Sequence, residues 1–447
     1  MLSSLFFVGV TLLLILEGMF LCGWFFGEKN FKRDLAFSLP LSAFTNVLIV
    51  FVFTCVSVPL NPWTLVGTHL IIMLVAFYFT RMIFEVQTEV PHPRTPLLIG
   101  IPCTVIIVST VIYAFSHAVL LPTFQYDSAT NWTMRSEISF YDEAIAFDKD
   151  ENRGMAKPQY PFFFHALQVT ANQGQTEWND TAANSILLLL SVATFAAVGL
   201  IVSMLRGKTH ALMTVTAFLT IPLLSLHLAQ GYGDINLAQQ FLLSAACMAA
   251  WIHSKNEKWL LLSAIFVAAS VWTKSEGAFF GLIPWILLSG YLYLQNKTDK
   301  KPLMKSGGLA LILSLPWLGF ALFKGLLLTP HGTDSFISFY PEGVSEAFFG
   351  LFFRGSFGIL WYVLFLLVPF ILTGVLKKSE SIGRKYAPVL YWGIFVFLGF
   401  LFVYLCTPNV QFLLNAESFY RQMMVAGALL VLGCSLCLKF KVTRNNP

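Results

Sequence analysis

The sequence predicts an all-α, polytopic transmembrane helical bundle of about 13 helices, with a long external loop that carries short amphipathic helices. Two observations lead to this fold class. The chain has 447 residues, of which 57% are hydrophobic and only 11% are charged, whereas soluble domains carry about 25% charged residues. Apolar runs of about 20 residues, long enough to cross roughly 30 Å of hydrocarbon, recur along nearly the whole chain.

The apolar runs define the expected membrane spans. The first run has no basic residues before it, and Glu28, Lys29 and Lys32 follow it where a small-residue cleavage site would be expected. It is therefore predicted to be a retained helix and not a signal peptide. The predicted spans are 4–26, 35–57, 63–80, 96–121, 184–205, 209–229, 235–253, 258–273, 278–295, 307–328, 356–376, 387–406 and 421–438.

Basic residues predict the orientation of these spans. Most of the 28 Lys and Arg residues lie in alternate connections between spans. Because Lys and Arg are retained on the cytoplasmic side, the N-terminus is predicted to lie outside and the C-terminus in the cytoplasm. The formal net charge of +5 then follows from topology and predicts no nucleic-acid partner. The basic connections are 27–34, 81–95, 206–208, 254–258, 296–306, 377–386 and 439–447.

One buried charge stands out among the first spans. Glu17 lies in the middle of the first predicted helix, where a charged side chain costs on the order of 3 kcal/mol. It is therefore predicted to face the bundle, either protonated or paired.

The connection 122–183 is by far the longest, and it falls on the predicted outer side. It is acidic but rich in aromatic residues. Connections longer than about 15 residues are usually functional or disordered. Two short amphipathic helices are predicted, around 136–147 and 160–171, with Pro161 in the first turn of the second.

Two carboxylates in this loop differ from its other acids, most of which are expected to be solvated surface charges. Asp142 and Glu143 are flanked by Tyr141 and by an apolar run that ends at Phe147. A carboxylate held on an apolar segment needs a charged or hydrogen-bonding partner, or it serves a function. Both are therefore candidates for a catalytic base.

Four Lys and Arg residues lie at the predicted outer membrane edge, whereas most of the other basic residues lie on the predicted cytoplasmic side. Any one of them could extend to the lipid headgroups, but together they predict an anion site. The anion most available there is a lipid phosphate or diphosphate, which Arg and Lys both bind. A carboxylate base beside a phosphate site suits transfer of a group from a phosphate-linked lipid. The four cations are Lys274, Lys324, Arg354 and Arg421.

Five short motifs carry a resemblance to a known family. In order along the chain they read YDEA (141–144), AKPQYPFFFHAL (156–167), GYGD (231–234), TKSEG (273–277) and SFYR (418–421). With this order and spacing the chain resembles the GT-C superfamily of membrane glycosyltransferases. The nearest branch is the glycosyltransferase family 39, protein mannosyltransferase and aminoarabinose transferase type.

The resemblance implies three regions. Residues 1–95 would hold extra transmembrane helices, 96–440 the GT-C-like catalytic core with the external loop 122–183, and 441–447 a short cytoplasmic tail. The family usually has its acidic loop after the first helix, whereas here three extra helices (1–80) come first. The chain also has Pro-Gln-Tyr-Pro in place of the family's Pro-Pro.

The resemblance also implies a mechanism on the external face of a plasma membrane, in a bacterial cell envelope. A sugar would move from a polyprenyl-phosphate donor to an acceptor hydroxyl on a lipid, glycan or protein, with inversion. Asp142, or as second choice Glu143, would be the base. Lys274 and Arg421, with Lys324 and Arg354, would bind the donor phosphate. Substrate-binding candidates are Tyr160, His165, Asp234 and Glu276.

The implied cofactors and the competing functions complete these expectations. No cofactor is certain, and the sequence has no metal-ligand spacing, although dependence on a divalent cation varies within the superfamily. A lipid-linked oligosaccharide polymerase or ligase would usually place its large loop late in the chain. A lipid-linked-sugar transporter or flippase would show internal repeats and mid-membrane polar residues, of which little is seen beyond Glu17.

Overall fold

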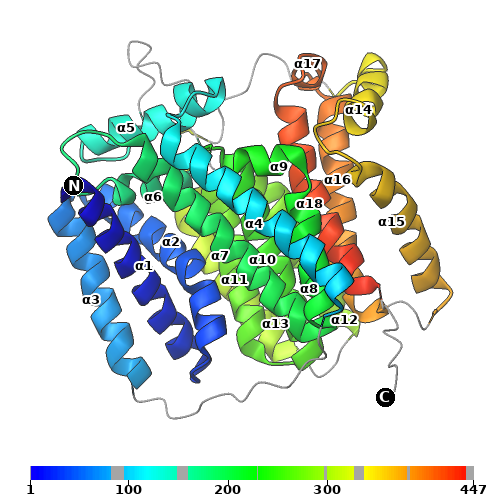
Figure 1. Cartoon of the computed structure of the whole chain (residues 1–447), viewed down its shortest axis with the longest axis horizontal. Coiled ribbons are helices and arrows are strands. Elements are labelled where there is room, and N and C mark those ends of the chain that lie inside the picture. The colour runs from blue at the N-terminus through cyan, green and yellow to red at the C-terminus, as the bar shows by residue number, and fades with distance from the viewer. Residues whose placement is uncertain are drawn as a thin grey trace.

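A computed structural model of the chain describes residues 2–81, 95–147, 160–228, 230–295, 300–326, 337–379 and 383–438. Within these residues the fold is all-α (Figure 1). Ten of the described helices are long and apolar enough to cross a membrane. The fold class predicted from composition is therefore confirmed.

The helices follow the predicted spans closely, and each predicted span overlaps at least one helix. The N-terminal and loop helices are α1 (Leu2–Phe26), α2 (Phe31–Val56), α3 (Pro62–Arg81), α4 (Leu97–Leu120), α5 (Met134–Tyr141) and α6 (Phe163–Ala171). The central helices are α7 (Asp180–Arg206), α8 (Lys208–Leu219), α9 (Pro222–His227), α10 (Gly233–Ser254), α11 (Glu257–Thr273), α12 (Ile283–Gln295) and α13 (Lys300–Phe323). The last helices are α14 (Glu342–Phe352), α15 (Leu360–Leu376), α16 (Ala387–Cys406), α17 (Val410–Leu414) and α18 (Ser418–Cys437).

One predicted span proved to be two helices. The segment 209–229 divides into α8 and α9 because Pro222, at the first position of α9, has no N–H to continue the hydrogen bonding of α8. The next amide, Leu223 N, instead donates to Ser356 O at 3.0 Å. This break places α9 against the segment that precedes α15, beside the polar site described below.

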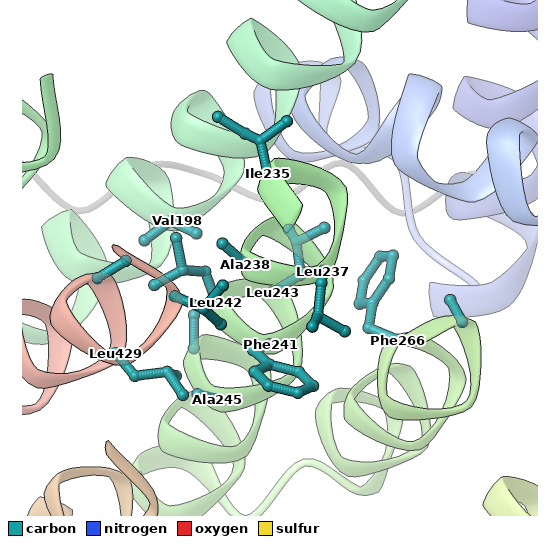
Figure 2. Close-up of a cluster of buried hydrophobic side chains, with 14 of the residues drawn as sticks. Val198, Ile235, Leu237, Ala238, Phe241, Leu242, Leu243, Ala245, Phe266 and Leu429 are labelled. Carbon is teal, nitrogen blue, oxygen red and sulfur yellow. The ribbon is translucent and has the colours of Figure 1, made fainter. Parts of the chain in front are cut away.

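The core of the bundle surrounds α10, which is buried over almost its whole length between α7, α11 and α18. Figure 2 shows Leu242 and Leu243 of α10 packed among Val198 of α7, Phe266 of α11 and Leu429 of α18. Alanines at several positions of α10, including 245, 246, 249 and 250, allow neighbouring helices to approach closely. The core thereby fixes the first turn of α10, which carries Asp234.

The helices α1–α3 form one flank of the molecule (Figure 1). α1 packs against α2 and α3, and α2 packs against α6 and α7. The described part of the chain starts on the side that carries α5, α14 and α17, and α18 ends on the opposite side (Figure 1). The predicted orientation of the two termini, outside and cytoplasmic, stays a prediction.

The two predicted loop helices exist with shifted ends. α5 ends at Tyr141, because Glu143 takes a left-handed conformation with φ of 49°. α6 begins at Phe163 with Phe162 as its N-cap, so Pro161 precedes the helix and does not occupy its first turn.

Candidate active site

A large cavity of about 1460 Å³ opens on the side of the bundle that carries α5, α14 and α17. The segment after α4, α9 with the residues around Tyr232, and the turn after α11 line one part of it. The end of α16, α17 and the first turns of α18 line most of the rest. Its polar residues include Asp127, Asn131, Lys274, Glu276 and Arg421. With Glu417, segments far apart in the sequence thus place two cations and three carboxylates around one space.

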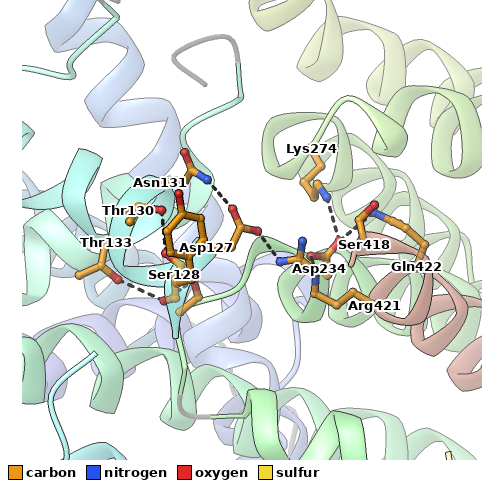
Figure 3. Close-up of polar contacts among 12 residues, drawn as sticks. Asp127, Ser128, Thr130, Asn131, Thr133, Asp234, Lys274, Ser418, Arg421 and Gln422 are labelled. Carbon is orange, nitrogen blue, oxygen red and sulfur yellow. Dashed lines mark hydrogen bonds and ion pairs between the residues drawn. The ribbon is translucent and has the colours of Figure 1, made fainter. Parts of the chain in front are cut away.

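Asp234 lies at the centre of the polar contacts (Figure 3). Its side chain is only 2% exposed, and Oδ1 accepts hydrogen bonds from Lys274 Nζ and Gln422 Nε2, both at 2.8 Å. Oδ2 lies 3.6 Å from Arg421 Nε. A carboxylate this deeply buried is stable only when it is paired and hydrogen-bonded, and these three partners satisfy it.

The glycines of the GYGD motif allow this packing. Gly231 has a φ of 54°, and a Cβ there would lie 2.7 Å from Ser128 Oγ. A Cβ on Gly233 would lie 2.6 Å from the ring of Trp132. The motif therefore lets the segment after α4 lie directly against the first turn of α10.

Lys274 follows the last residue of α11 in an extended conformation. Its ammonium is buried, and it lies 2.8 Å from Asp234 Oδ1 and 3.2 Å from Glu276 Oε1. Burial alone would lower the pKa of Lys274, but the two carboxylates outweigh it and raise that pKa. The side chain therefore stays charged, with its ammonium 5.8 Å from the ring centroid of Trp132 and 5.6 Å from that of Tyr160.

Asp127 and Arg421 form the second ion pair of the cavity. Asn131 Nδ2 donates to the other carboxylate oxygen of Asp127, and the guanidinium of Arg421 lies 4.8 Å from the ring centroid of Tyr232. Burial would raise the pKa of Asp127, but Arg421 and the Asn131 hydrogen bond lower it below the ordinary value of 3.8. Asp127 is thus ionised at neutral pH, half-buried and in contact with the cavity.

A stack of aromatic rings forms one wall of the cavity. Trp132 is stacked on Tyr160 with ring centroids 4.9 Å apart and an interplanar angle of 7°. Trp132 also stacks on His165, with ring centroids 5.7 Å apart and an interplanar angle of 14°. His165 is buried behind Trp132, where its Nδ1 lies 2.9 Å from Ser136 Oγ, and burial holds its pKa well below the ordinary value.

The structure gathers five of the ten predicted site residues and separates the others. Lys274, Arg421, Asp234, Glu276 and Tyr160 lie in or directly behind the cavity. His165 supports Trp132 from behind and does not line the cavity.

Two of the four predicted cations are elsewhere. Lys324 is exposed beside Phe320, with its ammonium 6.0 Å from that ring centroid. Arg354 pairs with Glu346 and lies 5.7 Å from the ring centroid of Tyr420. Neither lines the cavity, so of the four predicted cations only Lys274 and Arg421 do.

Asp142 and Glu143 do not face the cavity as expected. Both are exposed, at the turn that ends α5. The left-handed turn at Glu143 directs the apolar residues that follow, Ile145 and Ala146, into the protein and leaves the two carboxylates outside. Glu143 instead contacts the α2–α3 connection, where Asn61 Nδ2 donates to its carboxylate at 3.3 Å.

The sequence interpretation passed over three residues of this site: Asp127, Asn131 and Gln422. A signal for the first two was present, because an acid and an amide four residues apart follow the fourth span directly, a spacing that places them on one face of a helical turn. For Gln422 there was no such signal. The Lys-Pro part of the predicted 156–167 motif lies outside the described residues.

No group of three or more His, Cys, Asp or Glu side chains suited to a metal ion occurs in the described part of the chain. Dependence on a divalent cation therefore stays an open prediction.

Comparison with known proteins supports the fold. No protein-family model matches the sequence, and no curated protein is detectably similar to it. The structure is similar to that of ArnT from Cupriavidus metallidurans in the apo state, with a TM-score of 0.55 and 14% identity over 75% of this chain. It is also similar to ArnT bound to undecaprenyl phosphate, with a TM-score of 0.54 and 14% identity over 74% of this chain.

The match covers 59% of the ArnT chain in both structures. The likeness shows that the chain shares the overall fold of ArnT.

Proposed function

We propose that this protein is a membrane glycosyltransferase that moves a sugar from a polyprenyl-phosphate donor to an acceptor hydroxyl. One observation supports this above all. A carboxylate, Asp127, and two cations, Lys274 and Arg421, line a single large cavity in a chain that shares the fold of ArnT. The site thus combines a base with groups that stabilise a departing phosphate.

Lys274 and Arg421 are the proposed phosphate ligands. They approach Asp234 from two directions, so both can turn toward an anion in the cavity without leaving their buried partner. Arg421 offers a planar fork of donors and Lys274 a point charge, and both kinds of group bind phosphate well. The similar fold of ArnT bound to undecaprenyl phosphate supports a polyprenyl carrier.

Asp127 is the proposed base, in place of the Asp142 and Glu143 expected from the sequence. The acceptor oxygen attacks the anomeric carbon while its proton passes to a carboxylate oxygen of Asp127. The bond between the anomeric carbon and the phosphate oxygen breaks with inversion, and its electron pair leaves with the lipid phosphate. Lys274 and Arg421 stabilise the charge that develops there, and Asn131 holds the Asp127 carboxylate in place.

The sugar is proposed to bind through groups that donate hydrogen bonds. Three oxygens of cavity residues are buried and accept no hydrogen bond within the described part of the chain: Asn131 Oδ1, Glu276 Oε2 and Gln422 Oε1. The amide nitrogens of Asn131 and Gln422 already donate to carboxylates, which fixes the direction of both amides. Sugar hydroxyl or amino groups can supply the missing donors, and Trp132 and Tyr160 can cover an apolar sugar face.

The cavity is proposed to face the outside of a bacterial plasma membrane. The described part of α1 starts on the cavity side (Figure 1), and the basic connections predict that the N-terminus lies outside. A lipid-linked donor could then enter from the outer leaflet. The transfer experiment decides whether the acceptor is a lipid, a glycan or a protein.

The test is release of carrier from a labelled donor. The purified chain in lipid nanodiscs is incubated with a panel of undecaprenyl-phosphate sugars and membrane-extract acceptors, and free undecaprenyl phosphate is measured. We expect release of undecaprenyl phosphate together with transfer of label to the acceptor. Movement of intact donor across a vesicle membrane without cleavage would refute the transferase and favour a transporter. Transfer of preassembled oligosaccharides alone would favour a polymerase or ligase.

A further inference from the structure

A buried polar network connects the first three helices to α6. Glu17 of α1 lies 2.5 Å from His69 Nδ1 of α3 through its Oε2. The other ring nitrogen, His69 Nε2, lies 3.0 Å from Asn46 Oδ1 of α2. Thr170 of α6 donates to the same Asn46 oxygen at 2.9 Å. All four side chains are at most 1% exposed, so they form one continuous chain of contacts within the bundle.

Glu17 and His69 are joined by one hydrogen bond, between Oε2 and Nδ1. In the observed orientation of the amide, His69 Nε2 donates to Asn46 Oδ1. The proton shared with Glu17 then lies on either the carboxyl group or Nδ1. In both arrangements Glu17 is paired with His69, which meets the sequence expectation that Glu17 is protonated or paired.

Stability alone does not account for this network. Glu17 Oε1 and Asn46 Nδ2 are buried and have no hydrogen-bond partner among the described residues. A partly satisfied buried network is less favourable than an apolar core, and buried ion pairs can often be replaced by apolar residues with no loss of stability. The network therefore calls for another role.

The geometry of α6 suggests that role. Thr170 lies near the end of α6, and Phe164 and His165 lie near its beginning. Phe164 meets the Trp132 ring edge-on with centroids 5.6 Å apart, and His165 stacks on the same ring. Trp132 lines the cavity, and the Lys274 ammonium lies over its ring. A shift of α6 would thus displace the aromatic wall beside the proposed phosphate site.

We propose that Glu17, Asn46 and His69 are positioning residues that fix α6 and, through it, the Trp132 wall of the cavity. The helices α1–α3 would then act as a brace for the site, not only as membrane anchors. The inference about ligand affinity rests on the proposed function, whereas the inference about α6 does not. The two can be tested separately.

The first experiment needs no ligand. Thr170→Val removes the hydroxyl that binds Asn46 and keeps the shape of the side chain. Thr194→Val is the matched control, because Thr194 is equally buried on α7 and its hydroxyl has no partner among the described residues. We expect faster amide hydrogen exchange in residues 163–171 for Thr170→Val, restored by Thr170→Ser, and no change for Thr194→Val. Equal exchange in both Val variants would overturn the positioning role.

The second experiment compares stability with affinity. We expect Glu17→Leu/His69→Leu to unfold at the same temperature as the natural chain or higher, because the replaced groups are incompletely satisfied. The same variant should bind undecaprenyl phosphate about fivefold more weakly, the factor that corresponds to one net hydrogen bond. Glu17→Gln, which can still bond His69, should keep normal affinity. A large drop in unfolding temperature with unchanged affinity would show a structural role only.

The two proposals fail through different experimental results. If the natural chain binds no undecaprenyl phosphate, the proposed function is wrong, and the exchange experiment still decides whether the network positions α6. If the natural chain binds it and the Leu variant binds equally well, the brace is wrong and the proposed function stands.

Discussion

Replacing Asp127 by Asn tests the proposed base most directly. The change keeps the size of the side chain, and the new amide oxygen can still accept from Asn131 Nδ2. Arg421 loses one partner but keeps Asp234, 3.6 Å from its Nε. Because the Asp127 side chain is 27% exposed, loss of this ion pair should lower the free energy of unfolding by only about 1 kcal/mol.

The expected kinetic effect is much larger. Loss of a general base costs about 10²- to 10⁴-fold in rate, or roughly 3 to 5.5 kcal/mol in activation free energy. Binding of undecaprenyl phosphate should not weaken. The cavity is lined by three carboxylates (Asp127, Glu276 and Glu417) and two cations (Lys274 and Arg421), with Asp234 buried directly behind it, and the substitution removes one negative charge. The rate should therefore fall while the affinity for the anion holds or improves.

The assay measures single-turnover release of undecaprenyl phosphate alongside its equilibrium binding in nanodiscs. Asp142→Asn is the matched control, because it makes the same chemical change at an exposed turn outside the cavity. We expect the control to keep full activity. Suppose that Asp127→Asn retains more than a tenth of the natural rate while Asp142→Asn loses its activity. Asp127 is then not the base, and the assignment of Asp142 from the sequence is restored.

Three further outcomes follow from the site. Lys274→Met should lower the free energy of unfolding by roughly 3 kcal/mol because it leaves Asp234 buried without its closest cation, and adding Asp234→Asn should recover much of that loss in a denaturant titration. In the natural chain the Asp127 pKa lies below 3.8, so its ionisation should not limit kcat/KM above that pH. In Arg421→Gln only the weaker Asn131 hydrogen bond still opposes the effect of burial on that pKa, so the acidic limb of the pH profile should move to higher pH, and an unmoved limb would contradict the pairing. A protease site added at the N-terminus should be cleaved from outside intact cells, and one at the C-terminus should not.

The sequence was sufficient for the fold because bilayer thickness constrains each span. Apolar length located every crossing helix, and the exceptions have local causes, such as Pro222, which divides one span into α8 and α9. Ends of helices depend on single backbone conformations. The left-handed residue at Glu143 shortened α5 in a way that hydrophobic periodicity does not indicate.

The site was only partly predictable, because its geometry depends on contacts between distant segments. Lys274 and Arg421 were recognisable as cations on the side opposite to most basic residues. Lys324 and Arg354 showed the same sequence pattern, but their side chains lie outside the cavity. Charge and membrane depth do not determine which way a side chain points. The spacing of Asp127 and Asn131 marked one face of a turn, but the ion pair that gives Asp127 its role is with Arg421, almost 300 residues away in the chain.

The pair between Asp127 and Arg421 also bears on turnover. When Asp127 takes up the proton of the acceptor, it becomes neutral and its hold on Arg421 weakens. On the proposed mechanism the ion pair weakens as the departing phosphate gains charge. The guanidinium can then bind that phosphate more strongly. When Asp127 loses that proton to water, its carboxylate forms again and competes with the lipid phosphate for Arg421. This competition favours release of the lipid phosphate. A single ion pair would thus time both the stabilisation of the leaving group and the clearing of the site.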